Sequence, residues 1–529
     1  MKLIEALSIM SKSSPFAVST DRTSKSDLQT YKDYIYIETD IEKDFKQKLT
    51  SAKPHEIIFL CGSSGDGKSE ILTRYNQQFK ATRDFHLDAT HSFNPNQTAI
   101  QALDERFTEF KTSDKPLVVG INIGMLGNYA EEGHEDHLKI RKAIKSFLAG
   151  KHSDVPEEFI FLDFEDYPKF VFSDEANTSD FASKLITRLT EQTMDNPFYA
   201  LHQNQVKTSG HNQLTANFSL LGMPSVQSAI IDVLLKARLV KDQFLTARAL
   251  LDFIFQLLAG KGYLFDNLFA GGDNELLARI KSFDPSNAHT KLIDQFVLQF
   301  GLNIEDSEFE SFKTAIGEYG VFGLDKPSSY LRLFYLLKDA DFASDYHLQF
   351  TEEFNDHLVE RYASVWLAHR QFDGSGKQRI ELGKFYKEIL ISSIHRYCNR
   401  NAPALDKDVF FISEYNGFQT AVELNVKPNF HAIQRHSTDK LGAFEAYLQV
   451  SEKPLFPIPV SINLMELMIK INQGYRPNKH DKNAVILLDE VIEQIVDVAN
   501  EKDTIFILKE NDRYKITNED DEYFEVSGI

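Results

Sequence analysis

The chain has 529 residues, of which 42% are hydrophobic and 26% are charged. This length predicts two to four domains, and the composition excludes a disordered or fibrous chain. Acidic residues (78) outnumber basic residues (58), and the formal net charge is −20. We therefore do not expect stand-alone, non-specific binding to duplex DNA, although a local basic groove or a basic partner subunit would still bring DNA close.

The sequence predicts a cytoplasmic protein. Only two cysteines are present, Cys61 and Cys398, so no disulfide framework is expected and a reducing compartment fits. The first 15 residues contain no uninterrupted apolar stretch of a signal peptide, and nowhere do about 18 apolar residues follow one another. We expect neither export nor a membrane span.

The first third of the chain has an α/β pattern. Residues 1–50 are interpreted as an N-terminal arm with a polar stretch at 11–26 and a helix at 41–49. From residue 56, short apolar runs at 56–61, 84–88, 116–122 and 158–163 alternate with amphipathic helices at 68–79, 97–111 and about 135–148. This order predicts a doubly wound parallel sheet over residues 51–178, with ligands bound at the carboxyl ends of its strands.

The strongest chemical signal is a glycine-rich loop between the first run and the first helix. Residues 62–69 satisfy G-x-x-x-x-G-K-[ST] at every fixed position, and the flanking strand and helix supply the expected context. The glycines let successive main-chain N–H groups surround a β-phosphate at a helix N-terminus. The expected nucleotide-binding residues are Gly62, Ser63, Ser64, Gly65, Asp66, Gly67, Lys68, Ser69 and Glu70.

The expected ligands of this loop are ATP and Mg²⁺. Lys68 would bridge the β- and γ-phosphates, and Ser69 would offer its hydroxyl to Mg²⁺, an ion that keeps most of its water and needs few protein oxygens. Hydrolysis also needs an acidic residue near the metal and usually a group that orients water. In ATPases similar to the AAA+ and STAND type these acids close the third strand, but the corresponding run here, residues 117–123, has no acidic residue.

Three alternatives for the missing acid stay open. Asp88 follows the second strand, Asp163 and Glu165 follow the fourth, and Asn122 could act as a polar sensor of the γ-phosphate. All of them lie at carboxyl ends of strands, and Asp88 and Asp163 are candidate Mg²⁺ ligands beside Ser69. Arg248, on a helix predicted at 244–259, is a candidate to reach the γ-phosphate from a lid, or else a surface arginine.

Beyond residue 178 the pattern is almost wholly helical. We expect a lid-like helical module over 179–290, a helical domain over 291–452 and a C-terminal α+β region over 453–529. Three prolines between 454 and 459 mark the last boundary, and residues 504–509 and 513–517 form a hairpin. Residues 485–490 imitate an acidic metal-binding strand, but their apolar pattern continues to residue 496 with helical spacing, so we interpret them as a helix.

The predicted fold class is an α/β P-loop NTPase with an AAA+/STAND-like parallel sheet, followed by helical domains and a small C-terminal α+β tail. Residues 59–70, 85–92 and 120–126 resemble the DptF (DndF) family, over the full chain length. That family comprises the ATPase-like members of the DptFGH restriction set that accompanies bacterial DNA phosphorothioation. The resemblance implies an ATP-binding subunit that acts with DptG and DptH to restrict DNA lacking the phosphorothioate mark, with DNA reached through the complex.

Two other functions stay open. The chain could be a nucleotide-dependent scaffold without useful turnover, which the missing acidic pair favours, or a STAND-like signalling ATPase whose helical half detects a ligand or protein. A homo-oligomer is compatible with each. No nuclease motif is present, so no nuclease activity of the chain itself is expected. In the leading hypothesis, ATP binding closes the helical lid because the lid contacts the triphosphate more strongly in one arrangement.

Overall fold

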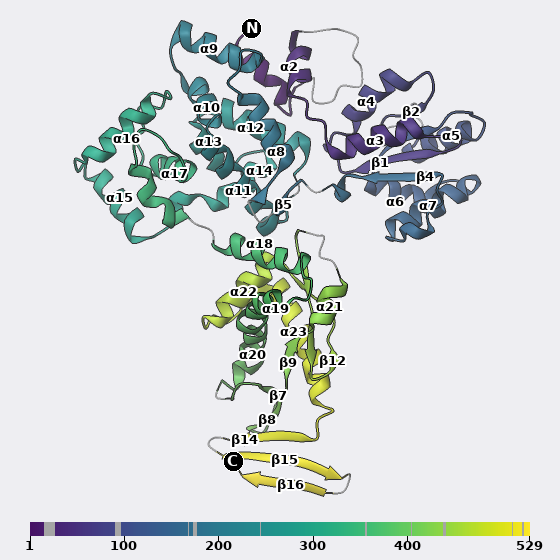
Figure 1. The fold of residues 1–529 in the computed structure, drawn as a ribbon, viewed down its shortest axis with the longest axis vertical. Coiled ribbons are helices and arrows are strands. Elements are labelled where there is room, and N and C mark those ends of the chain that lie inside the picture. The colour runs from purple at the N-terminus through teal and green to yellow at the C-terminus, as the bar shows by residue number, and fades with distance from the viewer. Residues whose placement is uncertain are drawn as a thin grey trace. The chain divides into compact units, whose positions relative to one another are not determined.

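The computed structural model describes residues 1–14, 27–89, 97–167, 169–172, 177–243, 245–354, 357–403, 405–436, 441–509, 512–520 and 523–528. The chain divides into two compact units (Figure 1). Unit 1 comprises Met1–Val171, Thr178–Ala237 and Gln243–Asn355, and unit 2 comprises Phe172–Asn177, Arg238–Asp242 and Asp356–Ile529. The division at residue 355 falls inside the predicted domain 291–452, and residues 453–529 belong to the same unit as residues 356–452.

Unit 1 contains the predicted parallel sheet. Its strands are β1 (Ile57–Gly62), β2 (Asp84–His86), β3 (Leu117–Asn122) and β4 (Phe159–Asp163), in the order β2-β3-β1-β4. The central strand β1 pairs in parallel with β3 on one side and with β4 on the other. Gly62 therefore stands opposite Asn122, and Cys61 stands opposite Asp163. The carboxyl ends of three strands meet at the end of β1.

Helices cover both faces of this sheet (Figure 1). The odd-numbered residues of β1, from 57 to 61, enter a core formed with α5 (Ala99–Lys111), α6 (Ile123–Glu132) and α7 (Leu138–Leu148). Residues 58 and 60 enter a second core formed with α3 (Asp40–Ser51) and α4 (Lys68–Phe79). A strand that is buried on both faces must be apolar throughout, which explains the unbroken hydrophobic run at 57–61.

The helical part of unit 1 follows the sheet. Its α-helices are α8 (Asp180–Thr190), α9 (Pro197–Ser209), α10 (Gln213–Leu221), α11 (Pro224–Lys241), α12 (Ala247–Ala259), α13 (Leu264–Phe269), α14 (Glu275–Ile280), α15 (Lys291–Gly301), α16 (Ser307–Gly317) and α17 (Pro327–Leu337). The end of α11, from Arg238, belongs to unit 2. Among the described residues, no single helix is long and apolar enough to cross a membrane. The pair α10 and α11, bent by 82°, meets that test by length and composition.

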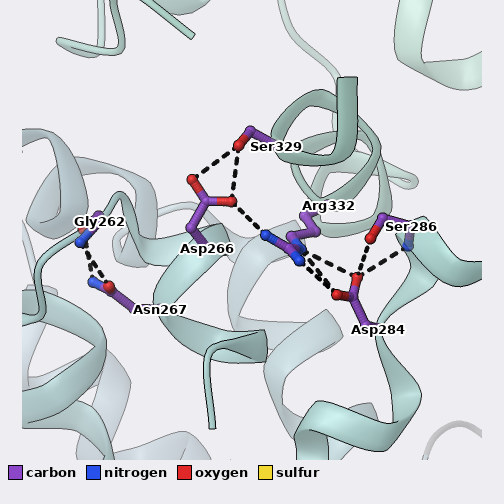
Figure 2. A network of polar contacts seen from close by, with 7 residues as sticks. All are labelled: Gly262, Asp266, Asn267, Asp284, Ser286, Ser329 and Arg332. Atoms are coloured by element: carbon purple, nitrogen blue, oxygen red, sulfur yellow. Dashed lines mark hydrogen bonds and ion pairs between the residues drawn. The ribbon is translucent and has the colours of Figure 1, made fainter. Parts of the chain in front are cut away.

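An ion-pair network connects α13 and α17 with the turn at 284–286 (Figure 2). The guanidinium of Arg332 donates to Oδ1 of Asp266 at 2.8 Å and to Oδ2 of Asp284 at 2.6 Å. Ser329 Oγ donates to Asp266, and the N–H and Oγ–H of Ser286 donate to Asp284. The side chain of Asp284 is only 8% exposed, so its charge depends on these donors.

Unit 2 combines helices with antiparallel sheets. Its helices are α18 (His357–Arg370), α19 (Gly376–Lys384), α20 (Ser392–Cys398), α21 (Phe430–Arg435), α22 (Ile462–Asn472) and α23 (Lys482–Ala499). The prediction of a helical domain over 291–452 is wrong for its last part, because residues 409–450 contain strands. The helical interpretation of residues 485–490 is confirmed, since they lie inside α23.

A five-stranded sheet in unit 2 contains the predicted hairpin. Its strands are β7 (Val409–Tyr415), β8 (Phe418–Glu423), β14 (Thr504–Lys509), β15 (Asp512–Asp520) and β16 (Tyr523–Gly528), in the order β16-β15-β14-β8-β7. The hairpin is β14 and β15, which pair antiparallel. It is not a separate tail, because β14 also pairs with β8.

The short segment Phe172–Asn177 also belongs to unit 2. The ring of Phe172 is 4% exposed and lies 5.2 Å from the Trp366 ring and 6.4 Å from the Tyr362 ring of α18. Both contacts are edge-on, the arrangement that aromatic pairs favour. A side chain that follows the sheet of unit 1 in sequence is therefore part of the core of unit 2.

Candidate functional site

The glycine loop, residues 62–69, connects β1 to α4 as the sequence predicts. Gly65 and Gly67 have φ values of +87° and +106°, a region that side chains with a Cβ rarely adopt. A Cβ on Gly62 would lie 3.0 Å from Asp66 Oδ2 and from Phe164 Cδ2. Gly67 is the N-cap of α4, so the first N–H groups of that helix have no partner within it. Main-chain donors thus gather at the positive end of a helix, the geometry that binds phosphate.

Lys68 lies across this loop. Its Nζ donates to the carbonyl oxygen of Gly62 at 3.0 Å and of Ser63 at 2.7 Å. Burial lowers the pKa of the Lys68 ammonium, while the carboxylates of Asp66, Asp88 and Asp163 act in the opposite direction. The loop therefore holds a half-buried cation among its carbonyl groups, where a bound anion would be neutralised.

The Asp66 side chain binds one group of the glycine loop and one group outside it. Its Oδ2 accepts a hydrogen bond from the Ser63 N–H at 2.6 Å, and its Oδ1 pairs with Lys169 Nζ at 2.9 Å. The side chains of Asp66 and Lys169 are 8% and 21% exposed. An unpaired carboxylate here would repel phosphate, and the Lys169 ammonium cancels its charge. Lys169 has no role in the sequence pattern, since no motif relates it to residue 66.

A cavity of about 520 Å³ adjoins the loop, within the size range of cofactor sites. Its polar lining comes from residues 64–70, from Asp88, Asn122 and Arg248, and from the arm residues Ser11, Lys32, Tyr36, Thr39 and Glu42. Its apolar lining comes from the N-terminal arm, α8 and α12, namely Ile9, Met10, Ile35, Ile37, Leu185 and Leu251. A cavity with both kinds of wall fits a ligand that combines a charged tail with a largely apolar ring.

Asp88, Asn122 and Arg248 are the predicted residues outside the loop that line this cavity. The Oδ1 of Asn122 accepts a hydrogen bond from the Met125 N–H at 2.6 Å and so caps α6. The main-chain N–H of Arg248, in the first turn of α12, donates to the carbonyl oxygen of Gly65 at 3.0 Å. This bond joins the helical part of unit 1 directly to the glycine loop.

Asp163 and Glu165 do not line the cavity. The carboxyl group of Asp163 is 9% exposed, and its Oδ1 accepts a hydrogen bond from the Glu165 N–H at 3.1 Å. It thereby caps the 3-10 turn Phe164–Asp166. Burial raises the pKa of this carboxyl group. Of the acids that the sequence leaves open, Asp88 is the one with a place in the cavity wall.

The N-terminal arm contributes residues that the sequence analysis missed. Lys32 of α2 (Asp27–Ile35) pairs with Glu70 of α4 at 2.8 Å, and Glu70 also accepts a hydrogen bond from Arg74 Nε at 3.0 Å. The Arg74 guanidinium lies 3.6 Å above the ring of Tyr36, whose hydroxyl donates to Glu42 at 2.5 Å. Tyr36 and Glu42 both line the cavity. Glu70 thus binds two side-chain cations and fastens the arm to the helix after the loop.

The N-terminal arm also contacts the helical part of unit 1. The main-chain N–H of Lys12 donates to Asp252 Oδ1 in α12 at 2.8 Å, and Asp252 is 3% exposed. The ring of Tyr31 in α2 lies 5.1 Å from the ring of Phe198 in α9. The alternation of Tyr and Ile at residues 34–37 was the available signal for a buried role of this segment. The arm therefore connects α4 with the helices that carry Arg248.

Comparison with known proteins gives no match: no protein-family model, no curated protein and no solved structure matches this chain. A group of three or more His, Cys, Asp or Glu side chains able to hold a metal ion is also absent from the described part of the chain.

Proposed function

We propose that unit 1 is a P-loop NTPase domain that binds ATP and Mg²⁺ in the cavity beside the glycine loop. The observation that carries this proposal is the loop itself. Two glycines with positive φ, a helix N-terminus and Lys68 surround one position, and these are the features that hold a polyphosphate. The apolar walls from the arm and from α12 suit the base of the nucleotide.

The residues at the cavity have distinct roles in this proposal. Ser69 and Asp88 would offer oxygens to Mg²⁺, which keeps several waters and therefore needs few protein ligands. Asn122 would contact the γ-phosphate through its amide. Arg248 would supply positive charge from α12, the helix whose main chain already binds Gly65. Asp163 is a weaker candidate for the metal, because its Oδ1 already caps the turn that contains Glu165.

The family resemblance supports a role in the cell. We propose an ATP-binding subunit of a bacterial phosphorothioation-dependent restriction complex, acting with DptG- and DptH-like subunits against unmodified foreign DNA. The net charge of −20 favours DNA contact through those partners rather than through this chain alone. The second candidate is a nucleotide-dependent scaffold or STAND-like signalling ATPase with little hydrolysis. It is favoured by the lack of acidic residues at 117–123.

Substitution of Lys68 tests nucleotide binding. Lys68→Ala removes the cation held by the Gly62 and Ser63 carbonyls, so we expect a loss of at least about tenfold in ATP affinity, equivalent to 1.4 kcal/mol. Calorimetric titration with ATP in magnesium buffer measures it. Lys80→Ala is the matched control, since Lys80 is exposed at the other end of α4.

Three outcomes test the proposed functions. If the wild-type chain shows no saturable binding of ATP, GTP or their diphosphates, the nucleotide proposal is wrong. If ATP binds but is not hydrolysed when DNA and both partner subunits are present, the ATPase role is excluded and the scaffold remains. Restriction that persists in a Lys68→Ala strain would mean that nucleotide is irrelevant to defence.

A further inference from the structure

One face of the five-stranded sheet in unit 2 is apolar and exposed. Residues that stand opposite each other in an antiparallel pair lie on the same face of the sheet. The register of the strand pairs places ten apolar side chains on one face, among them Ile505 and Ile516. We call this the aromatic face and define it by Tyr415, Phe418, Ile507, Tyr514, Phe524 and Val526.

Most side chains of the aromatic face are exposed, although their alternation with polar residues is typical of strands with one buried face. Tyr415 is 78% exposed, Phe524 is 68% exposed and Val526 is 60% exposed, and Phe418 and Tyr514 are about 40% exposed. On the opposite face, β15 and β16 carry polar residues such as Lys515, Glu525 and Ser527. Strands that alternate between apolar and polar residues normally bury the apolar side against another layer.

The aromatic face continues a buried core. Phe410 and Val422 stand opposite each other on the same face and are 1% and 2% exposed. The ring of Phe410 lies 5.2 Å from that of His395 in α20. Helix α20 therefore contributes to covering the part of this face around Phe410, while Tyr415 and Phe418 beside the β7–β8 turn and the side chains of β15 and β16 stay exposed.

The charges on this face disfavour nucleic acid and favour an uncharged apolar partner. Among the paired residues on this side, the charged ones are Lys509 and Asp512, which stand opposite each other in β14 and β15. The Lys509 ammonium lies 4.3 Å from the centre of the Phe418 ring. Aromatic sheet faces that bind single strands add an excess of positive charge, and here the two charges cancel.

We propose that the aromatic face binds the same face of a second copy of this chain. A neutral face is complementary to itself, whereas most of the surface of a chain with net charge −20 repels a second copy. A two-fold axis would pair the faces as two packed sheets. The exposed parts of the four aromatic side chains in each copy would together remove on the order of 900 Å² from water, near the ~1,000 Å² that specific interfaces exceed. Val526 adds to that area.

The oligomeric state of the full chain tests this proposal, independently of nucleotide binding. We expect sedimentation to show a dimer whose dissociation constant rises at least about tenfold in Phe524→Asp, because a charge would be buried in the interface. Ser527→Asp is the matched control, since Ser527 lies on the polar face of the same strand, and it should dimerise like the wild type.

Tyr415→Asp tests whether the effect of Phe524→Asp arises only from a folding defect in β16. Tyr415 lies on β7, at the other edge of the sheet, and its substitution should also weaken the dimer while far-UV circular dichroism stays unchanged. A wild-type chain that remains monomeric up to about 100 µM overturns the proposal. So does a dimer that survives both substitutions. Either result would mean that the face has another occupant, or none.

Discussion

An ion pair with Lys169 offsets the charge of the Asp66 carboxylate in the glycine loop. Asp66 occupies a position that the G-x-x-x-x-G-K-[ST] pattern leaves variable, yet its carboxylate binds the Ser63 N–H and the Lys169 ammonium. The Asp66 side chain is only 8% exposed and has Lys169 as its ion-pair partner, while the Lys68 ammonium also acts on it. If the loop binds phosphate as proposed, we expect Lys169 to strengthen that binding without touching the nucleotide.

Replacement of Lys169 should weaken ATP binding. Lys169→Met leaves an uncompensated carboxylate in the loop, a change that costs about 3–5 kcal/mol where both partners are buried. Because Lys169 is 21% exposed, we expect a smaller effect, about tenfold in the ATP dissociation constant, or 1.4 kcal/mol. Calorimetric titration of the variant measures it.

Two further variants make this test specific. Lys46→Met removes an exposed lysine of α3 and should leave ATP affinity unchanged. Adding Asp66→Asn to Lys169→Met removes the unpaired charge and should restore part of the affinity. An ATP dissociation constant that does not change in Lys169→Met would contradict the role assigned to the ion pair.

The loop was predictable from sequence because each of its positions has a local requirement. Gly65 and Gly67 need positive φ, and a lysine and a serine must follow. The choice between Asp88 and Asp163 was not predictable, because both follow strands that end at the same edge of the sheet. The difference lies in the next turn, where Asp163 is used as a cap. Tyr36 was missed because its contacts, Arg74 and Glu42, form only in three dimensions.

At the scale of elements, periodicity predicted the strands of the parallel sheet and α4 well. Helix α6 was missed because it begins directly at the end of β3, with Asn122 as its cap and no intervening loop. The strands between residues 409 and 450 were missed because most of them have only three to seven residues. Such short runs are hard to distinguish from turns of a helix. The long amphipathic helices gave no such difficulty.

The ion-pair network around Arg332 should stabilise the packing of α13 against α17 in a pH-dependent way. Burial acts to raise the pKa of Asp284, but hydrogen bonds from Arg332 and Ser286 outweigh it and hold that pKa below its ordinary value. A lowered pKa stabilises the fold above the unfolded-state pKa near 3.9. That contribution is lost as the pH falls through the folded-state pKa.

Asp284→Asn should therefore lower the free energy of unfolding by on the order of 2 kcal/mol at pH 7. The difference from the wild type should shrink as the pH drops below about 4, because the unfolded chain takes up a proton at Asp284 there, and it should vanish once the pH falls below the lower folded-state pKa. Urea unfolding at several pH values measures both effects. Asp325→Asn, an exposed carboxylate in the same unit, is the control, and a difference that stays constant with pH would contradict the assignment.

At the scale of the whole molecule, the cavity and the aromatic face lie in different units. Every residue that lines the cavity belongs to unit 1, whereas the aromatic face belongs to unit 2. The prolines at 454 and 459 suggested a domain boundary, but they lie in β12 (Lys453–Pro454) and β13 (Ile458–Val460), which are edge strands. Proline is tolerated at edges because no ladder donor is needed there. Composition alone could not distinguish prolines in edge strands from prolines in a linker between domains.

The separation of the units predicts two independent thermal responses. Saturating ATP and Mg²⁺ should raise the melting temperature of unit 1. Ligand at a hundredfold excess over its dissociation constant adds about 2.7 kcal/mol to the free energy of unfolding. Phe172→Ala should lower the free energy of unfolding of unit 2 by about 3–5 kcal/mol and so lower its melting temperature, because the buried ring loses its contacts with Trp366 and Tyr362. Differential scanning calorimetry resolves the two transitions.

The control for this prediction is Phe322→Ala, because Phe322 in unit 1 is 62% exposed and should affect neither transition strongly. Phe172→Ala should bind ATP as the wild type does. If it instead lost ATP affinity, or if ATP and the substitution shifted one shared transition, the two units would not be independent, and the division of roles would be wrong.

The interleaving of the segments also has a consequence for biosynthesis. Phe172 leaves the ribosome long before Tyr362 and Trp366, its partners in the mature fold. At about 5–20 residues per second, this aromatic ring waits on the order of ten seconds or more for them. During that interval the Phe172 ring has neither of these partners to pack against. The core of unit 2 around Phe172 therefore forms only after the last segment of unit 1, which ends at residue 355, has been synthesised.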